Sequence, residues 1–278
     1  MTEFQFKQWK RGDMRAPHKP LLVLHALGQW QQGKESVRWV EAQPAMERLL
    51  QLFGRPMKRQ SPENPWARLV NDGVWVVSPA PKLRNGNYVS QDLADADSTG
   101  ALSEALRERL RARPDDLVTI AHEVLDNHFP ASQHQDILLA CGIQLQPSTI
   151  ASKRKRDIGF ATVVIRNYGH RCAICGYNLQ LDNQVIGLEA AHILWHAYDG
   201  PAIVENGLAL CSLHHKLFDY GAFALQDDLS ILVSRNLNGN SVPEIARFHG
   251  ADIQKHSIDF IPPEIAFLRW QRAEVFKQ

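Results

Sequence analysis

The sequence predicts an α+β protein with a mainly helical N-terminal domain that contains a small sheet, followed by a C-terminal domain of strand-like segments and a helix. Three observations support this class. Leucines recur at helical spacing near the N-terminus, Asp-Gly and Asn-Gly pairs mark tight turns beside strand-forming residues, and a stretch rich in Pro, Ser and basic residues divides the chain. At 278 residues the chain is long enough for two domains of ordinary size.

Helices are expected to dominate the N-terminal half. Four leucines between residues 21 and 27 recur at helical spacing after "HKP", and Gly33 offers a stop. The stretch "QPAMERLLQLFG" predicts a second helix that ends at Gly54. Residues 101–128 and 132–141 are expected to form further helices.

The small sheet is predicted from two turn signals. "NDGVWVV" indicates a turn that leads into a short strand, and "RNGNYV" carries the Asn-Gly pair typical of a tight hairpin.

A change in composition marks the domain boundary. Residues 146–157, "QPSTIASKRKRD", contain four consecutive basic residues, Lys153 to Arg156. We expect an exposed basic linker at residues 149–156, between a domain at 1–148 and a domain at 157–278. The basic run either contacts phosphates or is only a solvated tether.

The C-terminal domain is expected to contain a helix in "DIGFATVVIRNYG", a strand in "VIGLEAAHI" and a helix in "LCSLHHKLFDYG" that stops at Gly221.

Composition limits the possible function classes. With 44% hydrophobic and 22% charged residues, the chain has the composition of a soluble globular protein. The net charge of +1 means that any basic footprint for nucleic acid must be local. The first residues, "MTEFQFKQWKRGD", lack the apolar run of a signal peptide, and "PLLVLHALGQW" is too short to span a bilayer. We therefore expect a cytoplasmic protein with no membrane segment.

The cysteine spacing predicts a structural zinc site. Cys172 and Cys175 form a Cys-x2-Cys pair, and Cys211 and His214 repeat the same gap downstream. Three thiolates and one imidazole make a closed tetrahedral zinc site. The alternative, free thiols beside a surface histidine, requires both gaps to arise by chance. Cys141 lies in an apolar helical context and is expected to be a buried small side chain.

His215 directly follows the predicted zinc ligand His214, and one helical step rotates a side chain by about 100°. It must therefore face elsewhere. Asp219 lies four residues further on, so a helix places His215 and Asp219 on the same face. An imidazole and a carboxylate at this spacing can share a divalent cation.

The pattern "C-x2-C … AAHI … NGLALCxxHHKLFDxG", over residues 157–225, resembles the HNH endonucleases, whose core is a ββα-metal fold. The resemblance implies that His192 is the general base and that Asn206 orients the base or supports the metal. It also implies that His215 and Asp219 bind the catalytic cation, with His215 counted among the catalytic residues.

The chemistry of these residue types fits hydrolysis of a phosphodiester. An imidazole can deprotonate water near neutral pH, and a cation such as Mg²⁺ or Mn²⁺ stabilises charge on the phosphorane and the departing 3′ oxygen. The sequence departs from the family at Ala191, where many members carry a further metal ligand. Glu189, two residues earlier on the same strand face, is a candidate to supply a carboxylate. His196 either contacts DNA or packs.

Three further stretches, "RGDMRAPHKPLLVLHALG", "NPWARLVNDGVWVV" and "HFPASQHQDIL", resemble the sulfur-binding domain of phosphorothioate-dependent restriction endonucleases. That family joins such a domain to a C-terminal HNH module. Sulfur in place of a non-bridging phosphate oxygen is larger and more weakly hydrated, so an apolar cup can bind it while penalising desolvation of oxygen.

The expected DNA contacts are of two kinds. Pro65 and Trp66, with Ala67 beside them, are expected to offer the apolar cup, although Asn64 stands where family members often have an aromatic residue. The polar candidates for phosphate or base contacts are His18, Lys19, Arg68, Arg84 and Asn85. The ordinary alternative for each is packing or a solvated surface group.

Together these observations predict a modification-dependent restriction endonuclease that binds phosphorothioated double-stranded DNA and hydrolyses it. One alternative is an HNH nuclease whose N-terminal domain recognises another modification, such as a methylated base, or a protein partner. A second is a non-catalytic zinc module that binds DNA, but the intact catalytic set argues against it. A homodimer is expected by analogy, since both strands must be cut.

Overall fold

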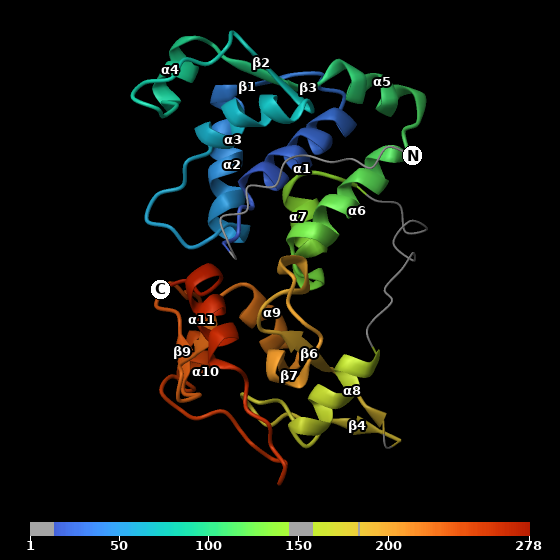
Figure 1. Cartoon of the computed structure of the whole chain (residues 1–278), viewed down its shortest axis with the longest axis vertical. Coiled ribbons are helices and arrows are strands. Elements are labelled where there is room, and N and C mark those ends of the chain that lie inside the picture. The colour runs from blue at the N-terminus through green and yellow to red at the C-terminus, as the bar shows by residue number, and fades with distance from the viewer. Residues whose placement is uncertain (1–13, 145–157, 183) are drawn as a thin grey trace. The chain divides into compact units, whose positions relative to one another are not determined.

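The computed structural model describes residues 14–144, 158–182 and 184–278. The chain divides into two compact units, Met1–Ser152 and Lys153–Gln278 (Figure 1). The expected linker at 149–156, with its basic run from Lys153 to Arg156, lies outside the described residues. Among the described residues, no helix has both the length and the apolar character needed to cross a membrane.

The first unit is mainly helical and contains one small antiparallel sheet in the order β1-β3-β2. Its elements are α1 (His18–Gln31), β1 (Val37–Arg38), α2 (Trp39–Phe53), α3 (Glu63–Arg68), η1 (Leu69–Asp72), β2 (Trp75–Ser78), α4 (Ser90–Asp95), β3 (Thr99–Leu102), α5 (Glu104–Ala112), α6 (Asp116–His128), η2 (Ala131–Gln133) and α7 (His134–Ala140). This arrangement confirms the predicted α+β class.

Most of the predicted N-terminal elements are confirmed. Helix α1 is buried along most of its length, and α2 ends at Gly54 as expected but begins earlier, at Trp39. "NDGVWVV" does form a turn and the strand β2. "RNGNYV" forms a tight turn closed by a single bridge between Arg84 and Asn87, with both central residues at positive φ.

The prediction that residues 101–128 are helical is wrong only at the start of the range and at one break. Strand β3 occupies the first part of this range, and two helices, α5 and α6, follow it. The break between them lies at Arg113, which has φ −141° and ψ 83°. Pro114 explains this, because proline disfavours the helical conformation in the residue that precedes it.

Three tryptophans form the centre of the first unit. The ring of Trp66 lies 5.1 Å from Trp39 and 5.1 Å from Trp75, edge to face in both cases. Gly100 of β3 allows this cluster to approach the sheet, since a Cβ there would lie 2.1 Å from the Trp75 ring. The N-terminal helices and the sheet are therefore joined through an aromatic core.

The second unit is built around a hairpin followed by a helix. Its elements are α8 (Ile158–Asn167), β4 (Gln180–Leu181), β5 (Gln184–Val185), β6 (Leu188–His192), η4 (His196–Tyr198), η5 (Val204–Asn206), β7 (Gly207–Cys211), α9 (Ser212–Asp219), β8 (Phe223–Leu225), β9 (Ile231–Val233), α10 (Val242–Ala246) and α11 (Ile265–Glu274). The order β6, β7, α9 is the ββα arrangement that the resemblance predicted.

The β6–β7 hairpin pairs Leu188 with Cys211 and His192 with Gly207. Helix α8 packs closely on this hairpin. The absence of a side chain at Gly207 allows the approach, since a Cβ there would lie 2.3 Å from the Val164 side chain. Helix α9 follows β7 without a loop and ends before Gly221, which has φ 73°. The pairing of β6 with β7 and the direct connection to α9 thus fix the positions of the side chains on these three elements relative to one another.

Candidate functional site

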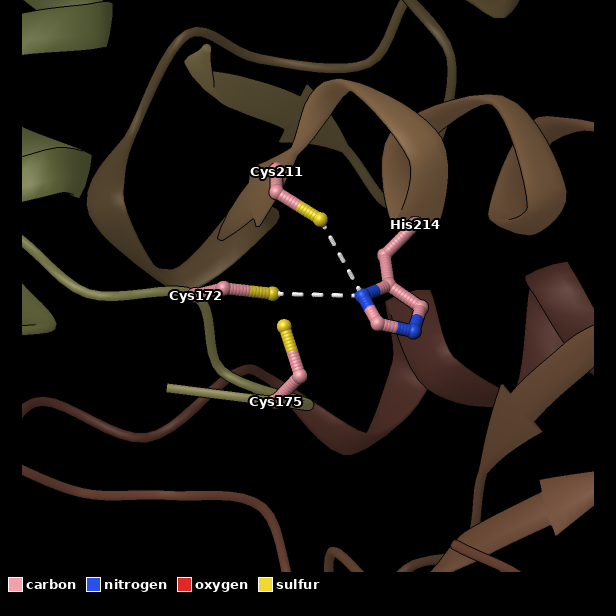
Figure 2. Close-up of side chains that lie close together, drawn as sticks. All are labelled: Cys172, Cys175, Cys211 and His214. Atoms are coloured by element: carbon pink, nitrogen blue, oxygen red, sulfur yellow. Dashed lines mark hydrogen bonds between the residues drawn. The ribbon is translucent and has the colours of Figure 1, made fainter. Parts of the chain in front are cut away.

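The four predicted zinc ligands lie together in the second unit. Their ligand atoms, from Cys172, Cys175, Cys211 and His214, are all within 4.8 Å of one another, and they converge on one point in Figure 2. The Nδ1 atom of His214 lies 3.2 Å from Sγ of Cys211 and 3.6 Å from Sγ of Cys172. Zinc bonds of about 2.3 Å to sulfur and 2.0 Å to nitrogen, at a tetrahedral angle, place such atoms about 3.5 Å apart.

The surroundings of this cluster also suit a closed structural site. Cys172 is fully buried and His214 is 4% exposed. A hydrogen bond with Cys211 lowers the pKa of the Cys172 thiol against the opposing effect of burial, so the cluster already favours a thiolate. Cys141, by contrast, lies in the first unit, where burial raises its pKa; the prediction that it is a buried small side chain is confirmed.

His215 faces away from the cysteines and lies between two carboxylates. Its Nδ1 is 2.7 Å from Oε2 of Glu189, and its Nε2 is 3.3 Å from Oδ2 of Asp219. The Asp219 side chain is 2% exposed and that of Glu189 is 50% exposed. Burial lowers the pKa of His215, but attraction to Asp219 and the hydrogen bonds to Asp219 and Glu189 outweigh it and raise the pKa to about 10.

His192 ends strand β6 and contacts α8. Its ring is stacked on Phe160, with centroids 3.9 Å apart and planes at 18°. The ring of His196, an exposed residue, lies 6.3 Å away. Glu189 of the same strand contacts α9 instead, so the alternation of the strand directs the two side chains to different helices. The sequence held no signal for the Phe160 contact.

Asn206 is fully buried. The sequence predicted that it lies on the loop directly before the helix, but it ends η5, and strand β7 separates it from α9. Its side-chain oxygen accepts a hydrogen bond from the Leu194 amide at 2.8 Å. Its side-chain nitrogen donates to the carbonyls of Leu194 and Pro201, at 3.0 and 2.9 Å. The amide therefore fixes the backbone that follows His192.

The expected apolar cup of the first unit requires a correction. Trp66 is fully buried between the other two core tryptophans, and its Nε1 hydrogen-bonds Ser98 Oγ at 3.3 Å. Pro65 is also buried. The short helix α3 turns this apolar face into the core, so Trp66 is a core residue and not an exposed surface for DNA.

Two of the polar residues predicted to contact DNA, Lys19 and His18, interact with other parts of the first unit or are largely buried in it. Lys19 pairs with Asp72, whose side chain is 1% exposed. Burial, assisted by the charge of Arg15, lowers the pKa of His18 to about 4, so His18 is neutral at pH 7. It can form hydrogen bonds to a phosphate but carries no charge toward it.

Three other candidates are accessible. Arg68 is exposed and lies 5.9 Å from the centre of the Tyr88 ring. Arg84 is 69% exposed and pairs with Asp92 at 2.8 Å. Asn85 is exposed at the turn, with φ 50°. Their positions are compatible with contacts to a nucleic acid.

Two family models match the chain. The model described as ScoMcrA-like, DNA sulfur-binding domain covers residues 4–146, and the model described as HNH endonuclease covers residues 172–226. A comparison with curated proteins gave no match.

Several solved structures are similar to parts of the chain. The sulfur binding domain of ScoMcrA complexed with phosphorothioated DNA is 22% identical over 49% of this chain and 92% of its own, with a TM-score of 0.42. The modification dependent TagI restriction endonuclease is 22% identical over 48% of this chain and 41% of its own, with a TM-score of 0.33. The Type IV phosphorothioation-dependent restriction endonuclease ScoMcrA is 23% identical over 46% of this chain and 25% of its own, with a TM-score of 0.40.

The sulfur-binding model spans half of the chain, and the HNH model spans the zinc cluster, the hairpin and α9. Both resemblances expected from the sequence are thereby confirmed. The chain belongs to the family with a ScoMcrA-like DNA sulfur-binding domain, and it carries an HNH endonuclease domain C-terminal to it.

Proposed function

We propose that this protein is a modification-dependent restriction endonuclease that binds phosphorothioated DNA through its first unit and hydrolyses DNA with its second. The observation that carries the proposal is the presence of both modules, a DNA sulfur-binding domain and an HNH endonuclease domain, on one chain. A recognition domain supplies the selectivity that a phosphodiester hydrolase lacks by itself.

In this proposal His192 is the general base that takes a proton from the attacking water. Stacking on Phe160 holds its ring, and the Asn206 amide fixes the backbone at Leu194, two residues later. His215 and Asp219 would hold Mg²⁺ or Mn²⁺. When bound, such a cation supplies charge stabilisation to the phosphorane and the departing 3′ oxygen.

The zinc proposed at the three cysteines and His214 has no part in the chemistry. It would join the knuckle at Cys172 and Cys175 to the start of α9, which carries His215. Its role is therefore to fix the helix that presents the catalytic cation site.

For recognition, we assign DNA contacts first to the exposed residues Arg68, Arg84 and Asn85. Pro65 lies one helical turn before Arg68, on the same face of α3, and its low exposure limits it to the floor of a cup. His18 remains a neutral hydrogen-bonding candidate.

The test uses the full chain and three versions of one duplex, with oxygen or with Rp or Sp sulfur at a single phosphate. We expect tighter binding and faster cleavage for one sulfur isomer, because only one of the two non-bridging positions of a phosphate can face the protein. Equal affinities for all three duplexes would show that the first unit recognises something else.

The matched variant for the chemistry is His192→Ala. It should lower the cleavage rate by about 10²–10⁴-fold while leaving affinity for the sulfur-containing duplex unchanged, because a general base acts only in the chemical step. Cleavage by the variant at the wild-type rate, at saturating enzyme and Mn²⁺, would remove His192 from this role. A wild-type chain that binds but never cuts would favour the non-catalytic alternative.

A further inference from the structure

Glu189 makes two hydrogen bonds across the junction between the hairpin and α9. Ser212 Oγ donates to its Oε1 at 2.9 Å, and Nδ1 of His215 lies 2.7 Å from its Oε2. We propose that Glu189 is a positioning residue that holds His215 through Nδ1, so that Nε2 and Asp219 together face the catalytic cation. This inference rests on the proposed function.

The tautomer of His215 follows from these contacts. A carboxylate only accepts hydrogen bonds, so the nitrogen that faces Glu189 must carry a proton. A cation bound at the other nitrogen, Nε2, would take the place of the proton there, while Glu189 keeps the proton on Nδ1. Nε2 is also the nitrogen near Asp219 Oδ2, at 3.3 Å. Nε2 and a buried carboxylate oxygen thus lie close enough together to hold one cation.

This assignment separates Glu189 from the ligand role that the sequence suggested for it. The two ring nitrogens point in different directions, and Glu189 lies on the Nδ1 side, away from the Nε2 that would bind the metal. Ala191, on the same strand face, provides no ligand. A carboxylate behind a metal-binding histidine instead fixes the orientation of its ring and raises its basicity.

The placement depends on the strand register. Glu189 pairs with Leu210, only one residue before the end of β7, and α9 begins directly after that strand. Ser212 and His215 are three residues apart and therefore lie on one side of the helix. The same helix face thus gives Glu189 both of its partners. A shift of one residue in the hairpin would turn Glu189 to the other face.

The test compares Glu189→Ala with Glu189→Gln in the full, zinc-containing chain. Glutamine keeps a carbonyl oxygen that can accept from Nδ1 but is a poor ligand for a hard cation. The probe is Mn²⁺ itself, with its Kd measured by calorimetry. We expect about 10–100-fold weaker Mn²⁺ binding in the alanine variant and recovery of most of this loss in the glutamine variant.

Glu244→Ala is the matched control, since it removes another exposed carboxylate of the same unit. It should leave the Mn²⁺ affinity unchanged. A second readout is the long-range ¹H–¹⁵N spectrum of Mg²⁺-saturated protein, which should show the His215 proton on Nδ1 in the wild type.

Two results would overturn the inference. One is equal loss of Mn²⁺ affinity in the alanine and glutamine variants, which indicates a direct ligand. The other is a His215 proton on Nε2 in the Mg²⁺-saturated wild type. Neither measurement requires cleavage, so failure of the proposed nuclease activity would be seen separately, as a chain that binds Mn²⁺ but leaves every duplex intact.

Discussion

Replacing each of the adjacent histidines with alanine should separate zinc binding from cleavage. His214 is 4% exposed, its Nδ1 faces two thiols, and its ring packs against Phe223 and Phe248, at 6.1 and 5.6 Å. A structural zinc contributes an apparent 10–16 kcal/mol in small zinc domains, on the order of the whole stability of an ordinary domain. Loss of one of four ligands should therefore cost several kcal/mol, or roughly 10–20 °C in Tm.

His215→Ala should behave differently, because that side chain faces Glu189 and Asp219. We expect it to retain one zinc per chain and a Tm within a few degrees of the wild type, while losing cleavage dependent on Mg²⁺ or Mn²⁺. The assay is zinc content by mass spectrometry, together with differential scanning calorimetry, on both variants. Equal zinc loss in the two variants, or full zinc retention by His214→Ala, would refute the assignment of the two histidines to different sites.

Further predictions concern the first unit. Gly100→Ala should lower the free energy of unfolding by about 1–3 kcal/mol in urea titrations, because the new Cβ would lie 2.1 Å from an indole carbon of the core. Burial, with the charge of Lys34, lowers the pKa of His25 to about 4, below its unfolded value near 6.5. The unfolded state thus binds more protons between these values, so stability should fall by roughly 3 kcal/mol as the pH is lowered through that window, and His25→Leu should remove this part of the loss. Lys19→Ala should lower the free energy of unfolding by about 3–5 kcal/mol, because it leaves the buried Asp72 carboxylate without its cation. Arg68→Ala should instead weaken DNA binding and reduce its salt dependence without changing Tm, because Arg68 is exposed.

Local spacing was sufficient to predict much of the second unit. The two Cys-x2 gaps place their ligands on short connected segments, and the four-residue step from His215 to Asp219 needs only one helix. The contact between Glu189 and His215 spans 26 residues and depends on the register of β6 and β7. No local pattern specifies that register, so the sequence could suggest a carboxylate there but not its partner.

In the first unit, local sequence patterns were not sufficient to predict which side chains are exposed. "NPWAR" forms a short helix whose orientation is set by distant residues, and its tryptophan packs between Trp39 and Trp75. Lys19 meets Asp72 across 53 residues, so its charge is engaged inside the protein. A list of apolar and basic residues identified candidate side chains but could not distinguish a face that packs in the core from one that is exposed to DNA.

The stacking of Phe160 on His192 has a consequence for dissecting and recombining this protein. The HNH family match begins at residue 172, so it excludes helix α8. This helix supplies Phe160, and its side chains pack against Gly207 of β7. A nuclease fragment that begins at residue 172 would retain the metal ligands but would lose the Phe160 ring that stacks on His192. A transplantable cassette should therefore begin no later than residue 158, and chimaeras that lack Phe160 and Val164 should cleave poorly, because they lose both the ring stacked on His192 and part of the core.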